Sequence, residues 1–149
     1  MIKNQRLITE KKYHTIITLR VDWADLDLFG HVNNVVFFRY IQAARVNYCE
    51  HIGLTSLNDN DQLSFMVASS QCHFKRPLKY PDSIEVATRA AWLKNTSLQL
   101  EYLIRNSEKE IVAEASDVIV VYDHHKKEKV VISEALRNVI REREGDVTL

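Results

Sequence analysis

Residues 13–21 alternate between a mainly apolar face and a mainly polar face. One face carries Tyr13, Thr15, Ile17, Leu19 and Val21, and the other carries His14, Thr18 and Arg20. A period of two is typical of a β-strand with one buried face. We therefore predict a strand over 13–21.

A different pattern follows, in which apolar side chains cover most of a helical surface. These side chains are Val35, Phe37, Phe38, Tyr40, Ile41, Ala44, Tyr48 and Ile52. The pattern predicts a helix over residues 34–52 that other elements enclose. Asn33 or Asn34 can cap its start, and Gly53 suits a left-handed cap at its end.

The second half of the chain is typical of an antiparallel sheet. A polar loop is expected over 54–63, and strands are expected over 65–76, 83–93, 97–106 and 110–122. Short polar segments at 94–96 and 106–109 favour hairpins, which join antiparallel strands. A last helix over 133–143 is expected to start at Ser133 and to turn Leu136, Val139 and Ile140 inward. The pattern predicts an α+β fold with one long helix wrapped by one curved sheet of five strands.

Composition narrows the class of protein. The 149 residues suit one domain spanning 1–149, and 46% are hydrophobic. Twenty basic residues balance twenty acidic ones, which argues against nucleic-acid binding. No apolar run reaches the roughly 18 residues of a membrane span, and the N-terminus lacks a signal-peptide pattern, so we expect no membrane insertion and a cytoplasmic location. Cys49 and Cys72 have no metal-type spacing and are interpreted as buried free thiols.

The side chains that could act in catalysis lie just before the long helix, in the segment of residues 23–34, Trp-Ala-Asp-Leu-Asp-Leu-Phe-Gly-His-Val-Asn-Asn. A helix start offers unpaired N–H groups and partial positive charge, which can polarise a carbonyl oxygen. Asp27 could attack that carbonyl or direct a water at it. A structural role for the same carboxylate, as an anion at the helix start, stays open.

The neighbouring residues admit other interpretations. Asp25 is interpreted as a source of turn or capping hydrogen bonds, and Asn33 as structural. His31 could contact a substrate, contact Asp27 or cap the turn. Asp25, Asp27 and His31 together could suggest a metal site, but no further ligands support one, so we expect no metal. Gly30 is expected to permit a backbone conformation or close approach that other residues could not make.

The strand, the sequence Asp-Leu-Asp-Leu-Phe-Gly-His-Val-Asn-Asn at 25–34, the buried helix and the sheet together resemble the hot-dog-fold acyl-CoA thioesterases. The 4-hydroxybenzoyl-CoA thioesterase-like group is the most similar branch, and the motif is also similar to that of plant acyl-ACP thioesterases. The Arg76-Pro77 pair before the strand at 83 fits the same family. The resemblance covers about residues 13–122 and implies the hot-dog fold.

The resemblance also implies roles for individual residues. Asp27 matches the catalytic nucleophile or general base, the backbone N–H of Asn34 matches the donor that polarises the thioester carbonyl, and His31 matches an active-site histidine of the acyl-ACP branch. Phe29 departs from that branch, which carries Asn there, so the simpler pair of aspartate and backbone donor fits better. The family implies no cofactor and a site assembled in a homodimer or homotetramer.

A CoA ester brings phosphates, which basic residues can attract. We expect Lys75, Arg76, Lys79 and Lys94 to form an electropositive rim, unless they are ordinary surface charges. The predicted function is hydrolysis of an acyl-CoA, or of an acyl-ACP, to a carboxylic acid. Two alternatives stay open: a module that binds acyl-CoA or acyl-ACP without turnover, and a hot-dog hydratase or dehydratase.

Overall fold

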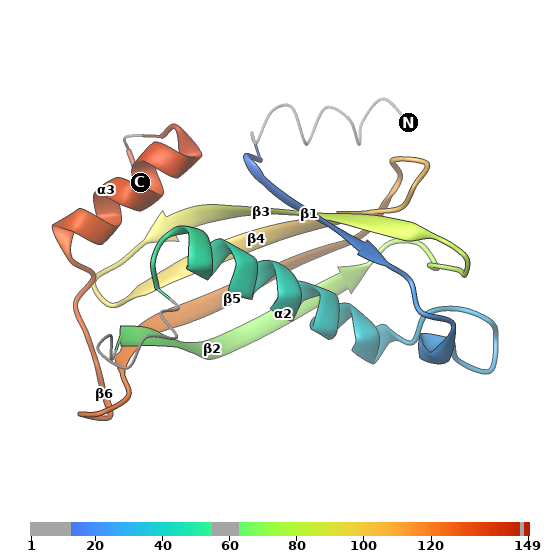
Figure 1. Ribbon diagram of the computed structural model, residues 1–149, viewed down its shortest axis with the longest axis horizontal. Helices are drawn as coiled ribbons and strands as arrows, with labels where there is room; N and C mark the ends of the chain where they lie inside the picture. The colour runs from blue at the N-terminus through green and yellow to red at the C-terminus, as the bar shows by residue number, and fades with distance from the viewer. Residues whose placement is uncertain (1–12, 55–62, 147) are drawn as a thin grey trace.

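One curved antiparallel sheet packs against one long helix in the computed structural model, which describes residues 13–54, 63–146 and 148–149 (Figure 1). The strands are β1 (Thr15–Arg20), β2 (Leu63–Phe74), β3 (Ser83–Leu93), β4 (Ser97–Arg105), β5 (Ile111–Asp123) and β6 (Glu128–Lys129). The helices are the 3₁₀ turn η1 (Trp23–Asp25), α2 (Asn34–His51) and α3 (Glu134–Glu144). This arrangement confirms the predicted α+β fold, although the sheet has a short sixth strand.

The strand order is β1-β3-β4-β5-β2, and β6 pairs with β5. The two predicted hairpins join β3 to β4 and β4 to β5. β2 does not pair with β3, its successor in sequence. It pairs with β5 from Leu63↔Asp123 to Phe74↔Ala113 and forms the far edge of the sheet. The predicted loop at 54–63 falls almost entirely outside the described residues.

Local side-chain chemistry fixes both ends of α2. Asn33 is the N-cap, since its side-chain oxygen accepts a hydrogen bond from the N–H of Val35. Gly53 follows the helix with φ +78°, the left-handed conformation that suits glycine. The inner face of the helix buries Phe37, Tyr40, Ile41, Ala44, Tyr48 and Cys49.

The prediction that other elements enclose α2 is only partly right. Val35 is 68% exposed and Phe38 is 40% exposed on the flank of the helix. The sheet ends at β2, so within the described residues one side of α2 has no covering element. Helix and edge strand therefore share an open, apolar border.

The last helix is fastened by polar contacts as well as by burial. Ser133 caps it, as predicted, by accepting a hydrogen bond from the N–H of Leu136. Ile140 is fully buried, whereas Val139 is 41% exposed and does not face inward as predicted. The buried carboxylate of Glu144 accepts hydrogen bonds from the Tyr48 hydroxyl at 2.7 Å and the Ala90 N–H at 3.0 Å. No helix of the described residues is long and apolar enough to cross a membrane.

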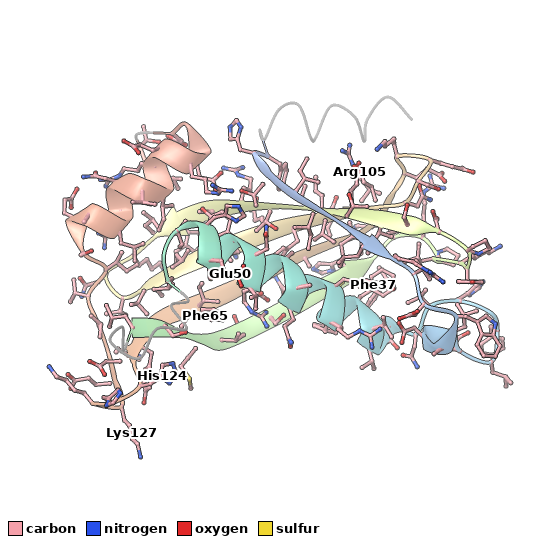
Figure 2. The ribbon with its side chains drawn as sticks, in the orientation of Figure 1. Phe37, Glu50, Phe65, Arg105, His124 and Lys127 are labelled. Atoms are coloured by element: carbon pink, nitrogen blue, oxygen red, sulfur yellow. The ribbon has the colours of Figure 1, made fainter. Side chains whose placement is uncertain are left out.

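A buried ion pair joins α2 to the middle of the sheet. The Arg45 guanidinium donates to Asp117 at 2.6 Å, and the Tyr102 hydroxyl donates to the same carboxylate oxygen at 2.7 Å. The Asp117 side chain is fully buried and that of Arg45 is 11% exposed. The guanidinium also lies over the ring of Phe65, which projects from β2 beside the C-terminal half of α2 (Figure 2).

Removing one partner of this pair should destabilise the fold strongly. We expect Arg45→Met to lower the free energy of unfolding by about 3–5 kcal/mol, because it leaves Asp117 charged and buried. The double variant Arg45→Met/Asp117→Asn should recover part of the lost free energy of unfolding, since the Asn side chain still accepts a hydrogen bond from the Tyr102 hydroxyl. Urea unfolding followed by circular dichroism measures both effects. A loss below about 1 kcal/mol in Arg45→Met, as for an exposed pair, would contradict this prediction.

Candidate active site

The loop between η1 and α2 folds back on Asp27. One carboxylate oxygen of Asp27, Oδ1, accepts hydrogen bonds from the N–H groups of Phe29 at 2.8 Å and His31 at 3.1 Å. The Asp27 N–H donates to the carbonyl of His31 at 2.7 Å. Gly30 makes this reversal possible, with φ +76°. The loop thus orients Asp27 through one oxygen and leaves Oδ2 without a hydrogen bond from the described residues.

The start of α2 presents one open N–H group beside this loop. The Asn33 side chain accepts from Val35, and the Asn33 carbonyl accepts from Val36 at 2.9 Å. The N–H of Asn34 has no acceptor among the described residues. It therefore carries the unsatisfied donor and the partial positive charge of a helix N-terminus.

The segment that follows β2 closes the other side of the site. Val32 donates to the carbonyl of Leu78 at 2.8 Å, and His31 pairs with Lys79 in an isolated β-bridge. The result is a cavity of about 330 Å³, lined by Asp27, His31, Val32, Asn34, Phe37, Phe74, Lys75, Arg76, Pro77 and Leu78. Asp27, His31 and Asn34 thus border one cavity.

Apolar residues from distant parts of the chain also line the cavity. The rings of Phe37 and Phe74 meet edge to face with centroids 5.2 Å apart, and Phe37 projects from the N-terminal half of α2 (Figure 2). Sequence reasoning did not identify Phe74 or Leu78 as lining residues. No local signal places these residues there, because the pairing of β2 with β5 decides where Phe74 lies.

The four predicted cations separate into two groups. Lys75 and Arg76 line the cavity, and Lys79 adjoins it through the bridge to His31. Arg76 also forms an ion pair with Glu110 at 3.0 Å. Lys94, which the sequence grouped with them, does not line this cavity. β3 ends beside α3, at the opposite end of the sheet from η1 (Figure 1). Lys94 directly follows β3, its ammonium lies 4.6 Å from the Trp92 ring centre, and Arg137 donates to its carbonyl.

The remaining polar residues of the motif have other partners. The Asp25 carboxylate forms an ion pair with Arg39 on α2 and does not cap η1, while its backbone carbonyl accepts from the Asn33 N–H at 2.9 Å. The His31 imidazole makes no hydrogen bond with the described residues. Phe29 is 81% exposed. Within the described residues, no group of three or more His, Cys, Asp or Glu side chains could hold a metal ion.

Solved structures with the same architecture include two bacterial proteins of at least 25% identity. One is a putative thioesterase, PA2801, from Pseudomonas aeruginosa, with 26% identity, a TM-score of 0.77, and coverage of 87% of this chain and 99% of its own. The other is a thioesterase from Thermus thermophilus, complexed with coenzyme A and Zn. It shows 30% identity, a TM-score of 0.78, and coverage of 89% of this chain and 96% of its own.

Sequence comparison points to the same family. The uncharacterised protein YsmA of Bacillus subtilis (strain 168) is 32% identical over 90 residues, a match that spans only 60% of either protein. The family model described as the thioesterase-like superfamily matches residues 21–140, from the end of β1 into α3. The chain therefore belongs to the thioesterase-like superfamily and has its hot-dog fold.

Proposed function

We propose that this protein hydrolyses the thioester of an acyl-CoA to a carboxylic acid and free CoA. The observation that carries the proposal is that the Asp27 carboxylate and the open N–H of Asn34 border the same cavity. One group is a nucleophile or base, and the other is a donor for the oxygen that gains negative charge. Hydrolysis of a thioester needs both.

The proposed reaction uses the two oxygens of Asp27 differently. Oδ1 is held by two backbone N–H groups, so Oδ2 is the oxygen that attacks the carbonyl or takes a proton from an attacking water. Charge that develops on the thioester oxygen is stabilised by the N–H of Asn34 and the positive end of α2. If Oδ2 is the nucleophile, the C–S bond breaks as an anhydride of Asp27 and the acyl group forms, and water then hydrolyses the anhydride to the acid and the free carboxylate, with the acid's proton passing to the CoA thiolate. If Asp27 is the base, the resulting hydroxide adds to the carbonyl carbon, the C–S bond breaks, and the proton taken by Asp27 passes to the CoA thiolate. His31 borders the cavity and is proposed to contact the substrate.

Coenzyme A is the proposed carrier because two basic residues line the cavity and a third adjoins it. Lys75, Arg76 and Lys79 lie together after β2, and phosphates favour such a surface. The similar Thermus thermophilus thioesterase was solved with coenzyme A. The same site could accept an acyl carrier protein, and the assay below distinguishes the two carriers. A cytoplasmic location remains a prediction from the sequence.

Asp27→Asn should lower kcat for acyl-CoA hydrolysis by roughly 10²–10⁴-fold, since Asn neither attacks nor accepts a proton. Thiol release from a panel of acyl-CoA and acyl-ACP substrates measures the loss, and mass analysis separates hydrolysis from hydration. Glu134→Gln on α3 serves as the control, because its exposed ion pair with Arg141 lies outside the site. Full activity in Asp27→Asn would refute the assignment. Binding without thiol release by the wild type would instead indicate a binding module.

Cys72 is another potential nucleophile near the cavity, because it lies two residues before Phe74 on the same face of β2. Its side chain is only partly buried, in contrast to the prediction, whereas Cys49 is fully buried. Burial raises the pKa of the Cys72 thiol to about 11. The thiol is therefore protonated at neutral pH and a poor nucleophile.

We expect iodoacetamide to alkylate Cys72 in the native protein at least about 100-fold more slowly at pH 8 than an ordinary peptide thiol. The rate should rise as the pH approaches 11, because the reactive thiolate forms only there. Mass spectrometry of timed samples measures the rate, and protein in urea is the control in which both thiols react. Rapid alkylation of the native protein at pH 8, or loss of thioester hydrolysis in Cys72→Ala, would contradict this prediction and make Cys72 a candidate nucleophile again.

We further propose that two copies pair along β2. This strand is twelve residues long, stands at the edge of the sheet and exposes Leu63, Met66, Val67 and Phe74. An exposed, apolar edge of this length is a template for pairing with another strand. Val35 and Phe38 on the open flank of α2 extend the same apolar surface toward the cavity.

Val67→Lys should shift the protein from dimer or larger assembly toward monomer, because it places a charge on the exposed edge. Sedimentation velocity measures the assembly, and activity is expected to fall with it. Val131→Lys is the matched control, since Val131 is 59% exposed but lies between β6 and α3. A wild type that sediments as a monomer would contradict the proposal.

A further inference from the structure

The loop that carries Asp27 has little apolar anchorage. η1 buries none of its residues, and Trp23 is 72% exposed. At the loop tip, Leu28 and Phe29 are 96% and 81% exposed. Only Leu26 and Val32, at the base, pack against the core. Burial therefore fixes the base of the loop, and polar contacts must hold the rest.

Asp25 supplies such contacts to α2 at two points. Its backbone carbonyl accepts the N–H of Asn33, the N-cap residue, at 2.9 Å. Its carboxylate pairs with the guanidinium of Arg39, just over one turn into the helix from Asn34. Within the described part of the chain, no other side-chain hydrogen bond or ion pair joins residues 22–31 to α2.

The environment of this ion pair differs from that of an ordinary surface pair. The Asp25 side chain is only 12% exposed, while that of Arg39 is 58% exposed. A carboxylate that has lost most of its hydration gains more from its partner than one in open water. Breaking the pair would leave the Asp25 carboxylate shielded from water and without its cation. Movement of the loop that exposes this carboxylate to water would then lower the free energy.

From this geometry we infer that Asp25 and Arg39 are positioning residues, which hold the Asp27 loop in register with the open N–H of Asn34. The inference rests on the proposed function. Asp27 follows Asp25 by two residues, and Asn34 directly follows the residue whose N–H Asp25 accepts. Because attack and charge stabilisation need placement to within about 0.5 Å, a small shift of the loop lowers the rate while binding persists.

A double-mutant cycle in kcat tests this inference. Asp25→Asn and Arg39→Gln should each lower kcat about tenfold with KM within twofold of the wild type. The double variant should lose no more than either single variant, because both remove one interaction. Arg39→Lys, which keeps the charge, should restore kcat to within about threefold. Glu134→Gln, which removes the 2.9 Å pair with Arg141 on α3, is the matched control and should leave kcat unchanged.

Three kinetic results would overturn the inference: kcat within twofold of wild type in both single variants, losses that multiply in the double variant, or a rise in KM alone. The last would assign Arg39 to substrate binding. Hydrogen exchange of the Asn33 amide provides a readout that needs no activity. Exchange at least tenfold faster in Arg39→Gln supports the restraint, and unchanged exchange contradicts it. An inactive wild type would refute the proposed function, and the restraint would then be decided by exchange alone.

Discussion

Burial of one face of α2 against the inner surface of the sheet is the interaction on which the rest of the structure, including the candidate site, depends. Phe37, Ile41, Ala44 and Tyr48 are at most 3% exposed, and each large apolar side chain buried in this way stabilises the fold by about 1.5–3 kcal/mol. The Arg45–Asp117 pair adds a directional contact between the helix and the sheet to this packing. A helix held so firmly has an N-terminus at a defined place.

The candidate site occupies that N-terminus, where two segments with different kinds of support meet. The segment after β2 is tied to the site by backbone hydrogen bonds and by the contact between Phe74 and Phe37. The Asp27 loop is held by its own turn, by backbone hydrogen bonds and by Asp25, with little buried surface at its tip. The proposed nucleophile or base, Asp27, thus lies on a loop, while the helix and sheet beneath it supply the rigidity.

The exposed border formed by α2 and β2 lies next to the candidate site, because both depend on where the sheet ends. Within the described residues the sheet ends at β2, so the apolar flank of α2 and the apolar side chains of β2 lie along one exposed border. Phe74 belongs both to this border and to the lining of the cavity. A second copy that covers the border would also shield the cavity from water, which strengthens the electrostatic interactions proposed for catalysis. The proposed assembly and the proposed chemistry are therefore linked.

Much of this protein could be predicted from local sequence. The alternation in β3 and β4, the polar hairpin segments and the Asn33 and Ser133 caps depend on neighbouring residues, so the sequence determined them nearly to the residue. The turn around Asp27 is also determined by neighbouring residues, because hydrogen bonds within five residues and the glycine at position 30 close it.

Only the tertiary structure decided which distant segments meet. The pairing of β2 with β5, and not with β3, brings Phe74, Lys75 and Arg76 to the cavity, and the length of β3 carries Lys94 to the other end of the sheet. The exposure of Val139 and of the flank of α2 depends likewise on which surfaces find a partner. Strand order and burial arise from contacts between residues far apart in the chain. The period of the hydrophobic pattern and the capping residues, in contrast, report only on near neighbours.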